Sequence, residues 1–397
     1  MIREPLNLPE SRHFYLHQPV NIHRHFAAHP TAAPLSPEPT SLTELERALH
    51  YPWARQLPPR GGTIELVPGI KWLRMDLPFV LRHVNIWLLR DRLGDREGWT
   101  VVDTCIDRAE SRADWTQVFA TELDGLPVLR LLATHMHPDH VGLAHWLCDR
   151  WSTPDYDCRL WMSATEYQTA RYASQAANSF GGDQLADYFR SHGMTDPVDL
   201  EGIRNRKDYY RNLVPALPPR FARLMDGAII TIGGLTWRCI AGYGHSREHM
   251  ALYCERINVL IGGDMMLPRI STNVSVYETE PEADSLMLFL DSIDRFLSLP
   301  EDVLVLPSHG RPFRGLHTRV HQLRSHHHDR LNEVIVATRH RPAYAYDLLP
   351  VLFKRDLDLH QTFFALGETV AHLNRLWHSG QLRRTRDAEG IWRFQAI

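Results

Sequence analysis

The sequence predicts an α/β protein in which two β-sheets pack face to face and helices cover their outer sides. The main observation is that two successive halves of the chain each contain a series of strand-like segments followed by helical spacing. A second observation is a late change to helical spacing and a hairpin pattern, which predicts a small additional domain. The 397 residues are enough for one large domain and a smaller one.

Residues 1–50 are expected to form an extended N-terminal arm. They are rich in proline and histidine, as in the segment from His29 to Pro37. Proline fixes a backbone dihedral and removes a hydrogen-bond donor, so such a segment does not build a packed unit. The segment from Thr43 to His50 has the composition of one short helix. The arm could contact a neighbouring subunit, which would give a homodimer.

Residues 51–316 are expected to form the main domain. Its first half contains short apolar runs bounded by turn residues, which is typical of strands. Helical spacing is found at 112–123 and 141–147. The strand-like segments of this half are 63–67, 71–75, 84–89, 100–103, 128–133 and 159–162.

Residues 164–224 interrupt this pattern with helical spacing and many aromatic residues, among them Tyr167, Phe180 and Tyr209. We expect a helical insertion, which is either a surface decoration or an aromatic-lined cap over an active site. A second series of strands follows the insertion. Its strand-like segments are 228–232, 237–241, 250–254, 258–261 and 303–306.

Residues 317–397 are expected to form a helical C-terminal domain. A predicted amphipathic helix at 367–376 is followed by two strand-like segments, 381–384 and 391–394, around a turn. A helix followed by a β-hairpin predicts a small winged-helix unit. Residues 311–397 contain 14 Lys and Arg against 8 Asp and Glu, so the tail is basic while the rest of the chain is acidic.

The overall composition excludes several classes of protein. The net charge of −3 does not indicate a general polyanion binder, and no apolar run reaches the length of a membrane span. The N-terminus lacks the apolar core of a secretory signal. Five cysteines without a Cys-x-x-Cys pair indicate scattered thiols of a reducing compartment. We therefore expect a cytoplasmic protein with no membrane span.

The most informative segment is the turn from His135 to His140, which reads His-Met-His-Pro-Asp-His. It brings His135, His137, Asp139 and His140 together directly after an apolar strand. Neutral imidazole and carboxylate are standard ligands of zinc and related divalent metals. A surface histidine patch is the alternative, but four such residues after a buried strand are hard to place without a metal. The segment therefore predicts a metal site.

One segment cannot saturate two metals, so further ligands have to come from other parts of the chain. Three residues at the ends of strand-like runs are candidates. They are His245, Asp264 and His309. A single His or Asp at a strand end is usually a cap or a surface residue. Three in this order after the histidine-rich turn are a much stronger signal.

With these residues, the sequence resembles the metallo-β-lactamase superfamily, whose hallmark is His-x-His-x-Asp-His followed by distant His, Asp and His. The resemblance covers about residues 60–315 and includes all seven ligand positions. It implies an αββα sandwich. The complete ligand set is similar to that of the glyoxalase II-like hydrolases. The C-terminal pattern resembles the winged helix of the β-lactamase-like protein 2 group, which includes an endoribonuclease and polyketide carrier-protein thioesterases.

The resemblance also implies a role for each ligand. His135, His137 and His245 would hold one divalent metal ion, and Asp139, His140 and His309 a second. Asp264 would bridge the two ions. Zinc is the expected metal, although iron and manganese accept the same donors. The two ions would share a hydroxide that attacks the substrate, with Asp139 and Asp264 as the catalytic carboxylates.

Other residues have weaker assignments. Asp103 matches the acidic residue that ends an early strand of the family, where it would orient a ligand; the alternative is a strand cap. His249 is expected to support its loop. Arg269 is proposed to contact an anionic group of the substrate, with a surface position as the alternative. The remaining histidines of the predicted helices are expected at the surface. They are His145, His317, His321, His326, His327 and His328.

Three functions are compatible with the sequence. The leading one is a metal-dependent hydrolase of a thioester, ester or lactone, because the near-neutral charge and the aromatic insertion suit a small acyl substrate. The second is a phosphodiesterase or endoribonuclease on the same centre, for which the basic tail is the support, although nucleic-acid binders usually have a clearer basic surface. The third is a non-enzymatic metal-bearing scaffold, in which the ligand set would serve no chemistry.

Overall fold

A computed structural model describes residues 43–176 and 180–397. The predicted N-terminal arm therefore lies outside the described residues, except for its end. There Thr43 caps α1 (Glu44–Arg47), and Glu46 returns a hydrogen bond to the Thr43 N–H, which forms a capping box. The short helix expected in this segment is confirmed.

The first sheet has seven strands in the order β1-β2-β3-β4-β5-β6-β7. Strands β1 to β4 are antiparallel to their neighbours, whereas β4, β5, β6 and β7 run parallel. The strands are β1 (Thr63–Val67), β2 (Ile70–Asp76), β3 (His83–Leu93), β4 (Arg96–Val102), β5 (Val128–Leu132), β6 (Arg159–Ser163) and β7 (Phe221–Leu224).

The second sheet has five strands in the order β12-β11-β10-β9-β8. Only the pair β11 and β12 is parallel among them. The strands are β8 (Ile229–Ile232), β9 (Leu235–Gly242), β10 (His249–Cys254), β11 (Val259–Gly263) and β12 (Leu304–Pro307).

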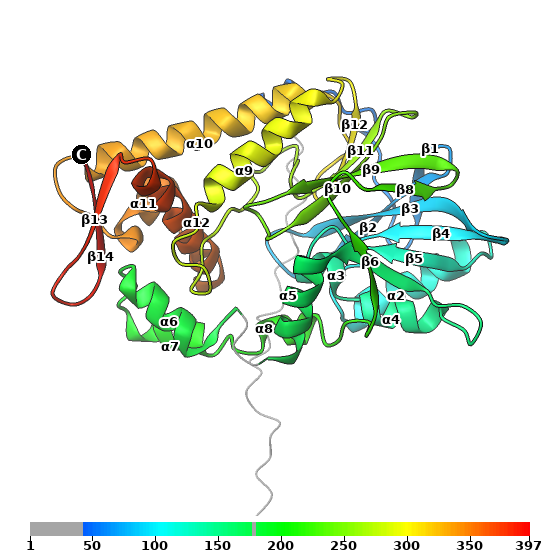
Figure 1. The fold of residues 1–397 in the computed structure, drawn as a ribbon, viewed down its shortest axis with the longest axis horizontal. Helices are drawn as coiled ribbons and strands as arrows, with labels where there is room; N and C mark the ends of the chain where they lie inside the picture. Colours follow the sequence, from blue (N-terminus) through cyan, green and yellow to red (C-terminus); the bar gives the residue numbers. More distant parts are fainter. Residues whose placement is uncertain (1–42, 177–179) are drawn as a thin grey trace, which may run out of the picture. The chain divides into compact units, whose positions relative to one another are not determined.

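The two sheets face each other across a buried layer that includes Trp72, Trp87 and Trp237. Helices α2 (Ala109–Thr121) and α4 (Ala144–Trp151) cover the outer side of the first sheet, and α9 (Ser285–Asp294) packs on β9 (Figure 1). Separate apolar layers under these helices hold them to the sheets. The predicted sandwich of two sheets between outer helices is confirmed.

The insertion contains four helices, α5 (Ala164–Gln175), α6 (Gly182–Ser191), α7 (Pro197–Arg204) and α8 (Tyr209–Leu213). Its expected helical range was too long, because residues 221–224 form strand β7 beside β6. The helix expected at 141–147 is divided into α3 (Pro138–Val141) and α4. At this break the backbone packs so closely that a Cβ on Gly142 would lie 2.7 Å from the carbonyl oxygens of Cys105 and Leu213.

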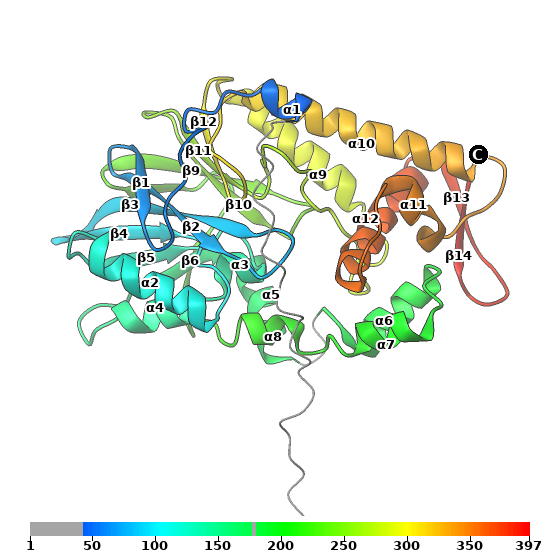
Figure 2. The same cartoon turned by 180° about the vertical axis from the view of Figure 1, so that it is seen from behind.

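The C-terminal part begins with α10 (Leu316–Thr338) and α11 (Leu349–Leu352). The long helix α12 (Leu359–His378) then leads into the hairpin of β13 (Leu382–Arg386) and β14 (Trp392–Ala396), as seen in Figure 2. The helix and hairpin predicted from the sequence are present. His327 was expected at the surface but is fully buried on α10, where its Nδ1 lies 3.3 Å from His372 Nε2.

All five cysteines are buried free thiols. Within the described ranges, none of the helices combines the length and the apolar composition that crossing a bilayer requires.

Candidate metal centre

The histidine-rich turn leaves the carboxyl end of β5, where the strand is buried on both faces. Pro138 is the first residue of α3, a position that its fixed dihedral favours. His135 and His140 are fully buried, while His137 and Asp139 keep partial exposure. The turn thus presents four donor side chains at one edge of the first sheet.

The remaining donors come from the second sheet. His245 lies in the loop between β9 and β10, Asp264 follows β11, and His309 follows β12. Because β11 and β12 are parallel, their carboxyl ends meet at the same edge. The structure therefore brings all seven predicted ligand residues together, from both sheets of the sandwich.

The donor atoms form two groups, and within each group they lie within 4.8 Å of one another. His135 Nε2 lies 2.9 Å from His137 Nδ1 and 3.2 Å from His245 Nε2. The first group consists of His135, His137, His245 and Asp264, and the second of Asp139, His140 and His309.

Asp264 faces both groups. Its Oδ2 lies 3.3 Å from His245 Nε2 in the first group, and its Oδ1 lies 3.4 Å from His309 Nε2 in the second. Asp139 Oδ2 lies 3.3 Å from the same His309 nitrogen and 3.4 Å from His140 Nε2. This position suits the bridging role that the resemblance implies for Asp264.

Three of the histidines are held by hydrogen bonds on the nitrogen that points away from the centre. His140 Nδ1 donates to Asp103 Oδ2 at 2.8 Å, and His309 Nδ1 donates to the carbonyl of His83 at 2.6 Å. His245 Nδ1 donates to the carbonyl of Asn273 at 2.7 Å. Such partners fix the ring orientation and leave Nε2 as an acceptor toward the centre.

Asp103 occupies an unusual backbone conformation at the end of β4. Its φ of 66° lies in the left-handed region, which costs a non-glycine residue about 1–3 kcal/mol. The carboxylate accepts the Thr134 N–H at 2.8 Å as well as the bond from His140. Asp103 thus holds the start of the histidine-rich turn, as well as one of its rings, in place.

His249 lies behind Asp264. Its Nε2 accepts the Asp264 N–H at 3.3 Å, and the ring is fully buried. Gly263 makes this approach possible, because its φ is 55° and a Cβ there would lie 2.1 Å from His249 Nε2. The contact suits the supporting role expected for His249.

The electrostatics of the centre favour positive charge. Burial lowers the pKa of His137 to about 3, with His245 adding to the effect. Burial also opposes a charge on His309, but Asp264 and Asp139 outweigh it and raise its pKa to about 10. In turn, burial would raise the pKa of Asp264, but His309 and His140 hold it well below its usual value. The carboxylates thus draw protons onto the second group of histidines.

The residues fit divalent cations. His140 Nε2, His309 Nε2 and Asp264 Oδ1 are buried and have no hydrogen-bond partner among the described residues. Leaving such atoms unpaired is costly, and buried carboxylates need compensating charge. Imidazole nitrogens and carboxylate oxygens at this spacing are the donor set that zinc, iron or manganese accepts. Cations would supply both the missing partners and the positive charge.

Two residues of the insertion hold the centre and were not singled out from the sequence. Buried Glu166 accepts the N–H groups of Met136 at 2.8 Å and Glu248 at 2.6 Å. The Tyr210 hydroxyl donates to the carbonyl of Met136 at 2.6 Å. Both lie in a segment where aromatic and charged residues are common, so the sequence contains no signal that distinguishes them.

Arg269 lies near α1, where its Nε is 3.8 Å from a carboxylate oxygen of Glu46. Its contact with a substrate stays a prediction.

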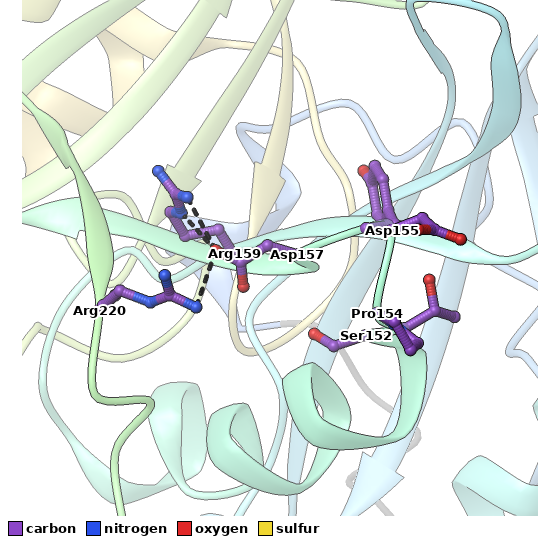
Figure 3. Close-up of a pocket in the computed structure, with 8 residues that line it drawn as sticks. Ser152, Pro154, Asp155, Asp157, Arg159 and Arg220 are labelled. Atoms are coloured by element: carbon purple, nitrogen blue, oxygen red, sulfur yellow. Dashed lines mark hydrogen bonds and ion pairs between the residues drawn. The ribbon is translucent and has the colours of Figure 1, made fainter.

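A separate surface cavity of about 390 Å³ lies beside the loop that precedes β6 (Figure 3). Arg159 and Arg220 both pair with Asp157 there, at 2.7 and 3.6 Å. The loop enters β6 at its amino end, whereas the histidine-rich turn follows the carboxyl end of the parallel strand β5. The cavity is therefore not part of the candidate centre.

A four-layer sandwich with two clustered sets of His and Asp donors at one edge defines a class of metal-dependent hydrolases. Residues 80–309 match the profile of the metallo-beta-lactamase superfamily, and residues 331–397 match that of the metallo-beta-lactamase-like C-terminal domain. The chain belongs to the metallo-beta-lactamase superfamily and is a metallo-hydrolase of that superfamily with a C-terminal domain of this type.

Individual relatives agree with this placement. The crystal structure of a beta-lactamase domain protein from Burkholderia ambifaria is 50% identical, covers 89% of this chain and 100% of its own, and has a TM-score of 0.84. The metallo-beta-lactamase family protein TTHA1429 from Thermus thermophilus is 26% identical, with 84% and 100% covered and a TM-score of 0.69.

A curated relative is the probable metallo-hydrolase YqjP of Bacillus subtilis (strain 168). It is 25% identical over 318 residues, which cover 77% of this chain and 91% of the relative. The superfamily and the fold predicted from the sequence are thus confirmed. The glyoxalase II-like subtype and the winged helix stay predictions.

Proposed function

We propose that this protein is a dinuclear metal-dependent hydrolase of a thioester, ester or lactone. The observation that carries the proposal is the convergence of seven donor side chains whose buried inner atoms lack partners. His135, His137 and His245 would hold one cation, and Asp139, His140 and His309 the other, with Asp264 between them. When bound, two divalent cations polarise the scissile bond and activate water.

The chain's own residues would orient the reaction. Asp103, Asn273 and the carbonyl of His83 fix three ligand rings before substrate arrives. Asp139 is the more exposed of the two carboxylates, with 16% of its side chain accessible against 9% for Asp264. Asp139 is therefore placed to accept a hydrogen bond from the attacking water at Oδ2, whereas Asp264 sets the separation of the two groups.

Aromatic residues near the centre support a small acyl substrate. Phe180 from the insertion stacks on Tyr210 and contacts Tyr277, which in turn stacks on Phe363 of α12. Tyr210 is bonded to the histidine-rich turn, so this aromatic row begins beside the donor groups. Ligand sites of enzymes are usually lined by such apolar and aromatic side chains.

Elemental analysis of the purified protein, followed by a hydrolysis screen, tests the proposal. We expect two equivalents of a divalent metal per chain and turnover of glutathione thioesters, acyl-CoAs or lactones. Protein that holds two metals but hydrolyses only a phosphodiester or RNA would refute the acyl substrate. Protein without bound metal and without activity after zinc, iron or manganese is added would refute the metal centre.

A phosphodiesterase or endoribonuclease is the second candidate, because the C-terminal hairpin contains several arginines. Most of them are already engaged within the chain. Arg384 packs on Trp377 and Trp392 and pairs with Glu282, and Arg393 pairs with Asp387. RNA binding would weaken steeply as salt increases, whereas thioester turnover would not. A steep salt dependence of binding to single-stranded RNA would favour this second function.

A further inference from the structure

Arg206 lies in the turn between α7 and α8, close to the candidate centre but outside its donor set. Its Nη1 donates to His360 Nδ1 of α12 at 3.0 Å. The guanidinium lies over the rings of Tyr209, at 4.2 Å, and Phe363, at 4.6 Å. Among the described residues, no carboxylate forms an ion pair with it. The cation is thus held between aromatic rings without a negative partner.

Two further donors of this guanidinium are left unused. Arg206 Nε and Nη2 are both buried, and neither has a hydrogen-bond partner within residues 43–176 and 180–397. Burial is also the main reason that the pKa of Arg206 is lowered. Unpaired buried donors of a charged group are costly, so a site that retains them is expected to serve a ligand.

Other arginines of the chain show what this edge of a guanidinium binds. Arg112 uses the same pair of atoms, Nε and Nη2, to hold the two oxygens of Asp107 at 2.7 and 2.8 Å. Buried Arg130 is satisfied by Asp91, and buried Arg319 by two backbone carbonyls. The free edge of Arg206 therefore matches a group with two adjacent oxygens, such as a carboxylate or a phosphate.

The position of Arg206 relates this edge to the metal centre. Tyr209, whose ring lies against the guanidinium, is close enough to Asp139 for that carboxylate to raise its pKa, in addition to the effect of burial. The next residue, Tyr210, donates to the carbonyl of Met136 between His135 and His137. The turn that holds Arg206 is therefore attached to the histidine-rich turn itself.

We propose that Arg206 binds an oxyanion group of the substrate, at the end remote from the bond that is cleaved. The substrate is then an acyl compound with a carboxylate or a phosphate, and Arg206 determines the preference for it over a neutral analogue. Because both nitrogens are covered in the present structure, the ligand has to displace side chains around them. The inference rests on the proposed function, since it places the ligand beside the metal centre.

Binding measurements test this inference without requiring turnover. Calorimetry on the metal-loaded protein would compare dicarboxylates from succinate to pimelate with monocarboxylates of the same chain length. A parallel series of ω-phosphonocarboxylates of these lengths distinguishes a phosphate-like group from a carboxylate. We expect tighter binding of at least one dianionic series, and Arg206→Gln is expected to weaken it at least tenfold while monocarboxylate binding is unchanged.

Matched variants separate binding from folding. Arg206→Lys keeps the charge but not the pair of donors, so it should recover only part of the affinity. Arg211→Gln removes an exposed arginine of α8 that pairs with Asp208, and it should bind like the wild type. Arg206→Gln should not lower the melting temperature, because it removes a buried charge that has no negative partner.

Equal affinities of the wild type and Arg206→Gln for both dianionic series would overturn the inference. So would an absence of preference for dianions in the wild type, or an equal loss of affinity for monocarboxylates and dianions in the variant. If dianions bind through Arg206 but no ester or thioester is hydrolysed, the proposed reaction fails while the anion site remains.

Discussion

At the scale of single residues, the centre depends on histidines that use both ring nitrogens. His140 donates from Nδ1 to Asp103, and its Nε2 faces Asp139 and Asp264. The sequence could predict which residues offer donor atoms, because His and Asp in that order are rare at strand ends. It could not predict the carbonyls of His83 and Asn273, since any residue type provides a carbonyl.

Asp264→Asn should remove most of the bound metal and of the activity, because an amide carries no charge and offers one oxygen to a centre whose groups it connects. Metal content measured by plasma mass spectrometry is expected to decrease from two equivalents per chain to one or fewer. Asp187→Asn changes an exposed aspartate of α6 and should keep full metal content. A fully loaded Asp264→Asn protein would show that the assignment of this ligand is wrong.

Gly263→Ala should destabilise the protein more than Gly94→Ala. Both glycines have a positive φ, but a Cβ at Gly94 meets no atom within 4 Å, whereas at Gly263 it would lie 2.1 Å from His249 Nε2. Gly94→Ala isolates the cost of the left-handed conformation, about 1–2 kcal/mol. Urea denaturation should give at least twice this loss for Gly263→Ala, together with weaker metal binding. Equal losses would mean that the ring moves aside freely.

At the scale of elements, α12 supports the loop that carries His245. Glu368 of α12 accepts a hydrogen bond from the Asn273 side-chain amide at 3.1 Å, and the Asn273 carbonyl accepts one from His245 Nδ1 at 2.7 Å. The helix approaches closely at Gly367, where a Cβ would lie 2.9 Å from Ser275. A C-terminal helix therefore positions a residue of the candidate centre, although the sequence indicated only an amphipathic helix in a separate domain.

Glu368→Gln should reduce the pH dependence of stability between about pH 4.5 and 7. Burial raises the pKa of Glu368 from 4.5 to about 7, so in this range the folded protein binds more protons than the unfolded chain. Stability linked to this group is then present below pH 4.5 and is lost as the pH rises to 7, by about 3 kcal/mol. The variant has no such group, so its free energy of unfolding should fall less over this range.

Urea unfolding at pH 5 and pH 7.5 measures this difference. Glu389→Gln, on the exposed hairpin turn, is the control and should follow the wild type. Identical pH profiles for wild type and Glu368→Gln would contradict the raised pKa.

The insertion shows where element prediction stops. Its helices were predicted from spacing, but residues 221–224 join the first sheet because β6 would otherwise leave an open edge. A four-residue strand has too few positions to show its period, so only pairing with β6 reveals it. Glu166 is similar, because its function arises from two backbone N–H groups that are distant in sequence.

At the scale of the whole molecule, the C-terminal part shares its apolar layer with the second sheet. One cluster contains Val305 of β12 and Phe289 of α9 together with Phe363, Leu366 and Val370 of α12. The strand order and the two facing sheets could be expected from the sequence, because apolar runs and turns recur with a regular spacing. The shared layer could not, since amphipathic spacing shows that a face is buried but not against which partner.

Removal of residues 331–397 should abolish cooperative unfolding. Phe363, Leu366, Val370 and Leu373 of α12 are fully buried, and each contributes about 1.5–3 kcal/mol, so their combined loss is comparable with the stability of a typical domain. Thermal unfolding followed by circular dichroism checks this. Removal of the hairpin alone, residues 381–397, should lower the melting temperature but keep a single transition. A shortened chain ending at 330 that unfolds cooperatively would show that the main domain is independent.

The carboxylate of Glu166 has a consequence for how the centre takes up its cations. It joins the loop that carries His135 and His137 to the loop that carries His245, through backbone groups that take no part in holding a metal. The two loops are therefore already assembled in the apoprotein, and little chain movement has to accompany loading. The rate of uptake should then follow the speed at which each metal ion sheds its own hydration shell, and it should differ between zinc and a more slowly dehydrating ion such as nickel.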